Sequence, residues 1–289
     1  MKTLNFRAAL LSLLLLLAVL GIWHLATKPA GVGGTTAGMT AEQIEYARMM
    51  GKNVGDASSS ATSGGFPTLT LMGQTAWGHL SNPFYDNGPN DKGVGIQIAH
   101  SLARVGLGFG LACLAAIPLG FLIGMSPLLS RALDPFIQVL KPISPLAWMP
   151  LALYTIKDSS ISGIFVIFIC SIWPMLLNTA FGVASVRRDW LNVARTLEVN
   201  PLRKAFLVIL PAAAPTILTG MRISMGIAWL VIVAAEMLVG GTGIGYFVWN
   251  EWNNLSLPNV IFAILTIGVV GMGLDWIFGH LQKAVTYVE

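Results

Sequence analysis

The feature that most constrains this chain is a set of long apolar runs that recurs along its 289 residues. A tilted helix needs roughly 20 apolar residues to cross the hydrocarbon of a bilayer. The runs occupy residues 8–26, 98–124, 135–154, 161–183, 212–239 and 258–280. They predict an all-α, polytopic membrane protein with six transmembrane helices.

The composition argues against a soluble domain. Charged residues make up only 10% of the chain and hydrophobic residues 55%, whereas a soluble domain carries about 25% charged residues. The net charge of +4 is too small to indicate nucleic-acid binding. Cys113 and Cys170 lie inside apolar runs, so they predict neither a disulfide framework nor a thiolate metal site.

The first run has two interpretations. It follows Lys2 and Arg7, as the apolar part of a cleaved signal peptide would. It is long for such a peptide, however, and residues 27–30 make a poor small-residue cleavage site. We therefore predict that residues 1–26 form a retained N-terminal transmembrane helix.

Residues 27–97 are rich in Gly, Ser, Thr, Asn and Pro and contain no run long enough to span a membrane. Residues 40–43 have the pattern of a capping box and predict a short helix that ends near Met50. Three interspersed aromatic residues suggest partial packing on the membrane face: Trp77, Phe84 and Tyr85. His79 has no partner at metal-ligand spacing, so a surface position is expected for it.

The basic residues predict the orientation. If the N-terminus is inside, Lys and Arg are more frequent in the cytoplasmic segments than in the external ones. Both termini are then cytoplasmic, residues 27–97 are external, and residues 281–289 form a cytoplasmic tail. Residues 98–280 form a five-helix core whose longest cytoplasmic loop covers residues 185–211.

The loop at residues 185–211 is the most informative segment. Asp189 can cap a short helix. Three apolar residues at helical spacing would form one face of it: Leu191, Ala194 and Leu197. The dipeptide at 200–201 would end this helix, and a second amphipathic segment would continue to Pro211. Apolar side chains on a projecting helix need either a protein partner or a lipid surface, and physics alone leaves both open.

This loop resembles the EAA loop of ABC importer permeases, whose pattern is Glu-Ala-Ala, three residues, Gly, nine residues, Ile, one residue and Leu-Pro. Alignment on Leu210 and Pro211 also matches Ala194, and Val208 is a conservative change. Glu198 stands where the pattern has glycine, and glycine permits a positive φ that a glutamate would adopt only with strain. Asn192, at the glutamate position, lacks a carboxylate for ionic contacts.

The resemblance covers about residues 98–280 and is greatest to permeases of the nitrate, sulfonate and bicarbonate group, through residues 145–152, 165–174 and 228–237. It implies a type I ABC importer permease fold in the inner (plasma) membrane, surrounded by lipid. The implied partners are a second copy, two cytoplasmic ATP-binding subunits and an external solute-binding protein. The implied cargo is nitrate or nitrite, or alternatively an organosulfonate, bicarbonate or cyanate. The residues implied to contact the ATP-binding subunits are Asn192, Val193, Ala194, Arg195, Thr196, Leu197, Glu198, Val199, Asn200, Pro201 and Leu202.

The chain carries no phosphate-binding loop of the Gly-x-x-x-x-Gly-Lys-Ser/Thr type. The glycine cluster at residues 240–245 lacks the lysine and predicts a turn outside the membrane. We expect no catalytic, cofactor or metal site in this chain, with ATP and Mg bound by the partner subunits. A different class, an ion-coupled secondary carrier or a membrane-anchored interaction subunit, remains the alternative.

Charged residues within the runs indicate where an anion could pass. Four lie inside predicted spans: Arg104, Lys141, Arg222 and Glu236. Such residues are costly in a bilayer and usually face a protein interior or an aqueous cavity. Arg222 falls near mid-bilayer, where a two-fold dimer would offer an anion two guanidinium groups. The candidate path set is Arg222, Arg104, Glu236 and Trp148. Alternatively, Glu236 of a neighbouring helix neutralises Arg222, while Arg104 and Lys141 extend toward the two surfaces.

Overall fold

The computed structural model describes residues 2–27, 66–88 and 91–285. Within these ranges all regular elements are helices, with one isolated β-bridge between Asp86 and Lys92. The predicted capping box at residues 40–43 lies outside the described residues. The chain divides into two units, residues 1–81 with 255–262 and residues 82–254 with 263–289.

Five of the six predicted spans are confirmed as single helices that are long and apolar enough to cross a membrane. These spans lie in α1 (Lys2–Ala26), α4 (Val94–Met125), α7 (Ser159–Ala184), α10 (Leu210–Val239) and α12 (Leu257–Val285). Pro118, Pro174 and Pro215 are accommodated inside three of these helices. Membrane helices tolerate proline where neighbouring groups satisfy the freed carbonyls.

The third predicted span, at residues 135–154, is not one continuous helix. It is divided between α5 (Pro127–Leu140) and α6 (Pro145–Ile156), which meet at 90° and make a sixth span only if the bent pair counts as one. Proline has no N–H to donate and disfavours helical geometry in the residue before it. Ser144 accordingly has an extended conformation with ψ of 137° before Pro145, so the prolines explain the bend.

The first unit contains α1, α3 (Leu69–Ser81) and the residues around the start of α12. The Trp23 indole donates a hydrogen bond to the Pro67 carbonyl at 3.0 Å. His79 lies 3.0 Å from the Asn259 side-chain oxygen, and its ring stacks on Phe262 at 4.9 Å. His79 is therefore half-buried, with one side in contact with Asn259 and Phe262.

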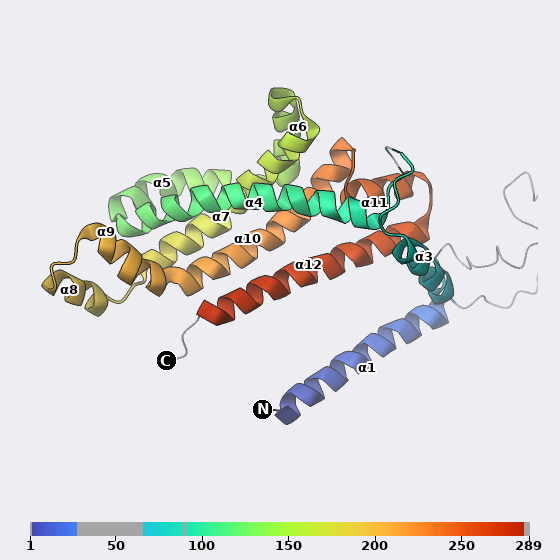
Figure 1. Cartoon of the computed structure of the whole chain (residues 1–289), viewed down its shortest axis with the longest axis horizontal. Helices are drawn as coiled ribbons and strands as arrows, with labels where there is room; N and C mark the ends of the chain where they lie inside the picture. Colours follow the sequence, from blue (N-terminus) through green and yellow to red (C-terminus); the bar gives the residue numbers. More distant parts are fainter. Residues whose placement is uncertain (1, 28–65, 89–90, 286–289) are drawn as a thin grey trace, which may run out of the picture. The chain divides into compact units, whose positions relative to one another are not determined.

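In the second unit, α4 and α10 pack on either side of α7 (Figure 1). Their facing residues are small or apolar and almost fully buried: Ala112, Ala116, Ile167, Met175, Ala213 and Ala228. A Cβ atom on Gly120 would lie 2.7 Å from the Leu176 carbonyl oxygen, so glycine is what allows α4 to approach α7 this closely. The Ser224 hydroxyl also links α10 to α7 by donating to the Ser171 carbonyl at 2.7 Å.

Short elements stand at the two ends of this helix bundle. At one end lie α8 (Arg188–Thr196), α9 (Pro201–Lys204) and a π-helical turn, η2 (Ala205–Ile209), that continues directly into α10. At the other end, the glycine-rich turn after α10 leads into α11 (Ile244–Asn253) (Figure 1). The loop that resembles the EAA motif is thus continuous with a central helix of the bundle.

Candidate functional site

Helix α8 ends in a tight turn at the position where the EAA pattern has glycine. The Val199 N–H donates to the Ala194 carbonyl and the Glu198 N–H to the Arg195 carbonyl, both at 3.0 Å. This pair of bonds defines a Schellman motif, which places one residue in the left-handed region. That residue is Glu198, with φ of 51°. The turn is therefore kept without glycine, and the chain tolerates the strain.

Two details of the predicted loop are wrong. Asp189 does not cap α8: the N-cap is Arg187, and Asp189 lies in the first turn, where its carboxylate still favours the positive end of the helix. Asn200 does not end α8, because the Schellman turn closes the helix at Thr196. The Asn200 side chain instead caps α9 by accepting a hydrogen bond from the Leu202 N–H at 3.3 Å.

The apolar residues of α8 divide between two faces rather than sharing one. Ala194 is buried, and Leu191 packs against a hydrophobic cluster that joins α7 to α10. Leu197, which was predicted on the same face, has 69% of its surface exposed. With Trp190 and Val193 it forms a second stripe at helical spacing that points away from the bundle. One face anchors α8, and the other is exposed, with the Arg187 guanidinium over the Trp190 ring at 5.8 Å from its centroid.

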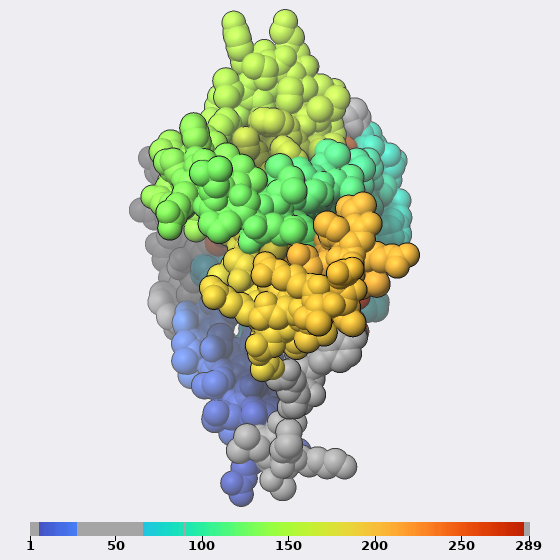
Figure 2. Space-filling model, turned by 90° about the vertical axis from the view of Figure 1, so that its left-hand side faces the viewer, coloured from blue at the N-terminus to red at the C-terminus, as the bar shows by residue number. Residues whose placement is uncertain are grey.

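The uncovered stripe continues past α8 along the start of the α9–α10 segment. We call the six exposed apolar residues of this region the coupling surface: Trp190, Val193, Leu197, Leu202, Phe206 and Leu207. A groove of about 360 Å³ lies beside Trp190 and Leu207. Figure 2 views this end of the bundle, with α8 and α9 in yellow-gold to orange. Arg188, Arg195 and Arg203 border the surface with positive charge.

The opposite end of the bundle holds a buried polar cluster. Arg104 on α4 donates to the Glu236 carboxylate at 2.8 Å, to the Thr242 carbonyl at 2.7 Å and to the Ser160 hydroxyl at 3.0 Å. Only 4% of Glu236 is exposed. One largely buried ion pair thus joins α4, α7, α10 and the turn before α11.

The glycine-rich turn completes this cluster. Backbone N–H groups donate to side-chain oxygens at three successive residues: Gly243 to Gln97 at 2.7 Å, Ile244 to Ser101 at 2.9 Å and Gly245 to Glu236 at 3.1 Å. A Cβ atom on Gly243 would collide with the Glu236 carboxylate. The glycine cluster forms a turn, as predicted, and the turn closes on the Glu236 carboxylate. Its position outside the membrane stays a prediction.

The structure pairs the intramembrane charges differently from the sequence-based alternative. Arg104 and Glu236 meet, so Arg104 does not simply extend toward a surface. Arg222 does not meet Glu236. It forms two parallel bonds to Asp275 on α12, from Nε and NH2, each 2.6 Å long. The sequence analysis missed Asp275, although it is the sole acidic residue in the run at 258–280 and an arginine within a span needs a counter-charge.

The remaining candidates are not brought together with these pairs. Lys141 caps α5 at the bend. Trp148 lies half-buried in the first turn of α6. Among residues 2–27, 66–88 and 91–285, no group of three or more His, Cys, Asp and Glu side chains is placed to hold a metal ion.

Comparison with known proteins identifies the family to which this chain belongs. Residues 116–287 match the family model described as the binding-protein-dependent transport system inner membrane component. The chain belongs to this family. It is therefore a permease subunit of an ABC importer, a class of transport component that works with ATP-binding subunits and a solute-binding protein.

Curated relatives of this permease subunit are similar over most of their length. The nitrate import permease protein NrtB of Synechocystis sp. is 47% identical over 210 residues, which cover 73% of this chain and 76% of the relative. The bicarbonate transport system permease protein CmpB of the same organism is 44% identical over 207 residues, which cover 71% and 74%.

Solved structures confirm the type I importer permease fold. A chain of the inward-facing MetNI methionine ABC transporter matches with a TM-score of 0.60 at 13% identity, covering 67% of this permease subunit and 96% of that chain. A chain of an amino acid ABC transporter matches with a TM-score of 0.54 at 14% identity, covering 65% and 92%. At this identity the likeness concerns the fold alone.

Proposed function

We propose that this permease subunit carries nitrate or nitrite inward across the inner (plasma) membrane. Two copies would form the path, two cytoplasmic subunits would bind ATP and Mg and hydrolyse the ATP, and an external binding protein would deliver the anion. The observation that carries the ATP-driven mechanism is the coupling surface. It is an uncovered apolar stripe on a helix that is anchored to the bundle and precedes α10.

Asn192 to Leu202 would transmit the movement of the ATPase subunits. The inner face of α8 is fixed by Leu191 and Ala194, while its outer face is free to enter a groove on a partner. Because α9, η2 and α10 follow one another without a break, a displacement at the coupling surface would reach the centre of the bundle. Arg195 and Arg203 could pair with acidic residues of the partner, although each exposed pair contributes under about 1 kcal/mol.

The cargo assignment rests on the relatives. One relative is named for nitrate and another, almost as similar, for bicarbonate. Both anions are small and planar, with three oxygens around one central atom. Nitrate or nitrite is our proposal because two nitrate permeases are 47% identical to this chain, against 43–44% for the bicarbonate permeases and 41% for a third nitrate permease. Bicarbonate, an organosulfonate or cyanate is the alternative cargo.

Arg222 is the strongest candidate to border the anion path. Its side chain is 40% exposed, whereas Arg104 and Glu236 satisfy each other inside the bundle. Arg104, Glu236 and Trp148 remain candidates of lower priority. Uptake of labelled nitrate by assembled Arg222→Gln and Arg104→Gln complexes tests the set: we expect slower uptake, and normal rates in both variants would remove these arginines from the mechanism.

The proposed orientation has both termini in the cytoplasm, as the distribution of basic residues favours. Single cysteines at positions 60 and 185 in a chain without Cys113 and Cys170 test it. On intact cells, an impermeant thiol reagent should label Ser60→Cys and leave Ser185→Cys unlabelled. The reverse pattern would overturn the orientation.

Two measurements test the function itself. An ATPase chain should purify with this permease after detergent extraction, whereas a secondary carrier or an interaction subunit would purify without one. Uptake of labelled nitrate should then be inhibited by excess nitrate and nitrite. If bicarbonate, cyanate or an organosulfonate inhibits uptake more strongly than nitrite does, the cargo assignment is wrong while the importer remains.

A further inference from the structure

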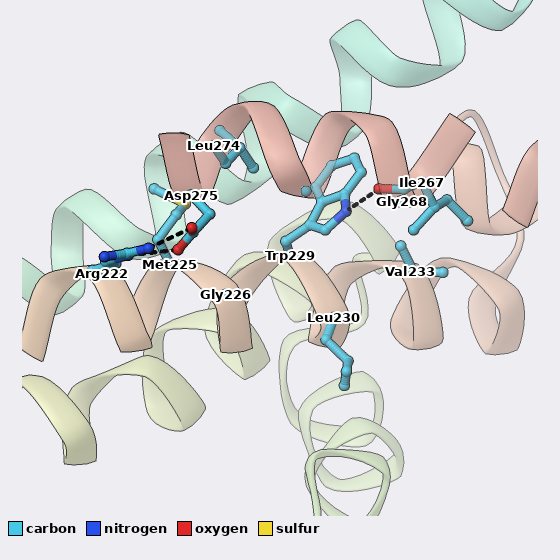
Figure 3. A pocket seen from close by; sticks show the side chains of 11 residues that line it. Arg222, Met225, Gly226, Trp229, Leu230, Val233, Ile267, Gly268, Leu274 and Asp275 are labelled. Atoms are coloured by element: carbon cyan, nitrogen blue, oxygen red, sulfur yellow. Dashed lines mark hydrogen bonds and ion pairs between the residues drawn. The ribbon is translucent and has the colours of Figure 1, made fainter. Parts of the chain in front are cut away.

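The Arg222 guanidinium and the Asp275 carboxylate form a bidentate, planar ion pair. The guanidinium donates from Nε and NH2 to the two carboxylate oxygens, and both bonds are 2.6 Å long (Figure 3). Arginine binds planar anions in this bidentate way because its donors form a rigid fork. Asp275 thus occupies a site whose shape suits other anions with two coplanar oxygens.

This fork opens onto a cavity of about 400 Å³ between α10 and α12. Arg222 and Asp275 lie at one end of the cavity, and Val233 and Ile267 lie at the other, with Trp229 between them (Figure 3). The side chains of Arg222 and Asp275 are 40% and 56% exposed within this chain. Charges at membrane depth face protein or water rather than lipid. The other residues that line the cavity are apolar or glycine, so the Arg222 guanidinium is the cationic donor that an anion would meet there.

Two further hydrogen bonds join α10 to α12 beside the pair. The Trp229 indole donates to the Ile267 carbonyl at 3.0 Å. The Gln282 amide donates to the Thr219 hydroxyl at 2.8 Å. These bonds join α10 to α12 on either side of the ion pair along both helices. Neither bond involves Arg222 or Asp275, so both can persist when the counter-ion leaves Arg222.

We propose that Asp275 is an exchangeable counter-ion, which yields its place on Arg222 to the translocated planar oxyanion and returns when the anion leaves. This inference rests on the proposed function. Nitrate and bicarbonate present two coplanar oxygens as a carboxylate does, so each can take both guanidinium bonds. Exchange also keeps binding weak, because the anion must displace a carboxylate that stays nearby and repels it. Weak binding is what a transport path requires, since a deep anion trap would prevent release.

The first experiment measures nitrate binding by the purified permease–ATPase complex without the solute-binding protein. The thermal midpoint is measured at increasing nitrate concentrations, with chloride at equal ionic strength as the reference. Asp275→Asn removes the competing carboxylate, so the nitrate concentration for half-maximal stabilisation should fall at least tenfold relative to the unmodified complex. Asp86→Asn, which removes the carboxylate of the exposed Lys92–Asp86 pair, is the matched control. It should leave the nitrate concentration for half-maximal stabilisation unchanged. An unchanged nitrate dependence in Asp275→Asn would overturn the exchange.

The second experiment measures labelled nitrate uptake by the full importer. Arg222→Met/Asp275→Leu replaces the pair by apolar side chains, which would preserve a merely structural contact. We expect this variant to assemble and its uptake rate to fall at least tenfold. Arg222→Lys keeps the charge without the fork, and its rate should fall while its apparent KM stays unchanged, because the binding protein sets the affinity. Normal uptake by either assembled variant would contradict the proposal.

The outcome for the unmodified importer separates this inference from the proposed function. If the unmodified importer carries nitrate and the variants match it in nitrate uptake and in nitrate-dependent stabilisation, only the proposal of an exchangeable counter-ion is wrong. If it carries bicarbonate instead, the cargo assignment fails and the thermal titration with bicarbonate decides the exchange. If it carries no oxyanion, both proposals are wrong.

Discussion

The two ends of the helix bundle show opposite patterns of burial. At the α11 end, polar side chains are buried: Arg104 and Glu236 pair inside the bundle, and backbone N–H groups of the glycine turn satisfy the oxygens around them. At the α8 end, apolar side chains such as Leu197 are exposed. The polar groups of the first region pair within one chain, whereas the second exposes an apolar stripe that we propose an ATP-binding subunit covers. Changes at the first should therefore affect the stability of the chain, and changes at the second should affect what the chain binds.

The largest expected effect on stability comes from breaking the buried pair. Glu236→Gln leaves the Arg104 guanidinium without its counter-charge in a largely buried site. Removing one partner of a buried pair typically costs about 3–5 kcal/mol. The thermal midpoint of the purified complex should fall markedly, and Asp275→Asn, at the half-exposed pair, should lower it less. Equal loss in the two variants would contradict the contrast in burial.

At the coupling surface we expect loss of the partner rather than loss of the fold. Leu197→Asp places a charge in the centre of the proposed contact, where truncating a well-packed apolar residue costs roughly 2 kcal/mol or more. The thermal midpoint of the permease alone should be unchanged, while ATPase co-purification or substrate-stimulated hydrolysis should fall more than tenfold. Leu128→Asp, at an exposed leucine on α5, is the matched control. Normal coupling in Leu197→Asp would refute the docking assignment and favour a lipid-facing helix.

The glycine turn offers a smaller test of the buried end. Gly243→Ala would push a methyl group into the Glu236 carboxylate, which is held in place by Arg104 and Ser101. Overpacking of this kind costs about 1–3 kcal/mol. Gly106→Ala is the control, because nothing lies within 4 Å of the Cβ atom it would add. The thermal midpoint should fall in the first variant and not in the second, and no difference between them would mean that the turn is not closely packed.

The smallest expected effect is a gain in stability at the coupling end. Glu198→Gly relieves the positive φ of 51° in the Schellman turn, which should stabilise the turn by about 1 kcal/mol. Glu198→Ala removes the charge but keeps the Cβ atom, so it should give no such gain. Thermal midpoints of the two variants distinguish the backbone effect from the charge effect. A gain in the alanine variant alone would show that the side-chain charge, not the backbone, limits the turn.

The two ends also differ in how far the sequence alone predicts them. The spans are predictable because hydropathy depends on local composition, although the prolines at 142 and 145 turn the third run through 90°. The place of the coupling segment follows from its resemblance to the EAA loop. The resemblance does not predict which face of α8 packs on the bundle, because that depends on the position of the hydrophobic cluster between α7 and α10.

The ion pairs could be predicted only in part. Arg104, Arg222 and Glu236 stand out as charges within apolar runs, and each needs a partner. Their partners lie 132 and 53 residues away along the chain, and the choice depends on helix packing. The glycine turn was predicted as a turn, but its closure on Glu236 requires the three-dimensional position of α11.

ATP-driven nitrate uptake by the reconstituted importer is the decisive measurement for the proposed function. The permease, its ATPase subunits and the binding protein are placed in proteoliposomes, and accumulation of labelled nitrate is measured with and without ATP on the cytoplasmic side. We expect accumulation that needs both ATP and the binding protein and that is lost in Leu197→Asp. Accumulation that follows an imposed ion gradient without ATP would contradict it.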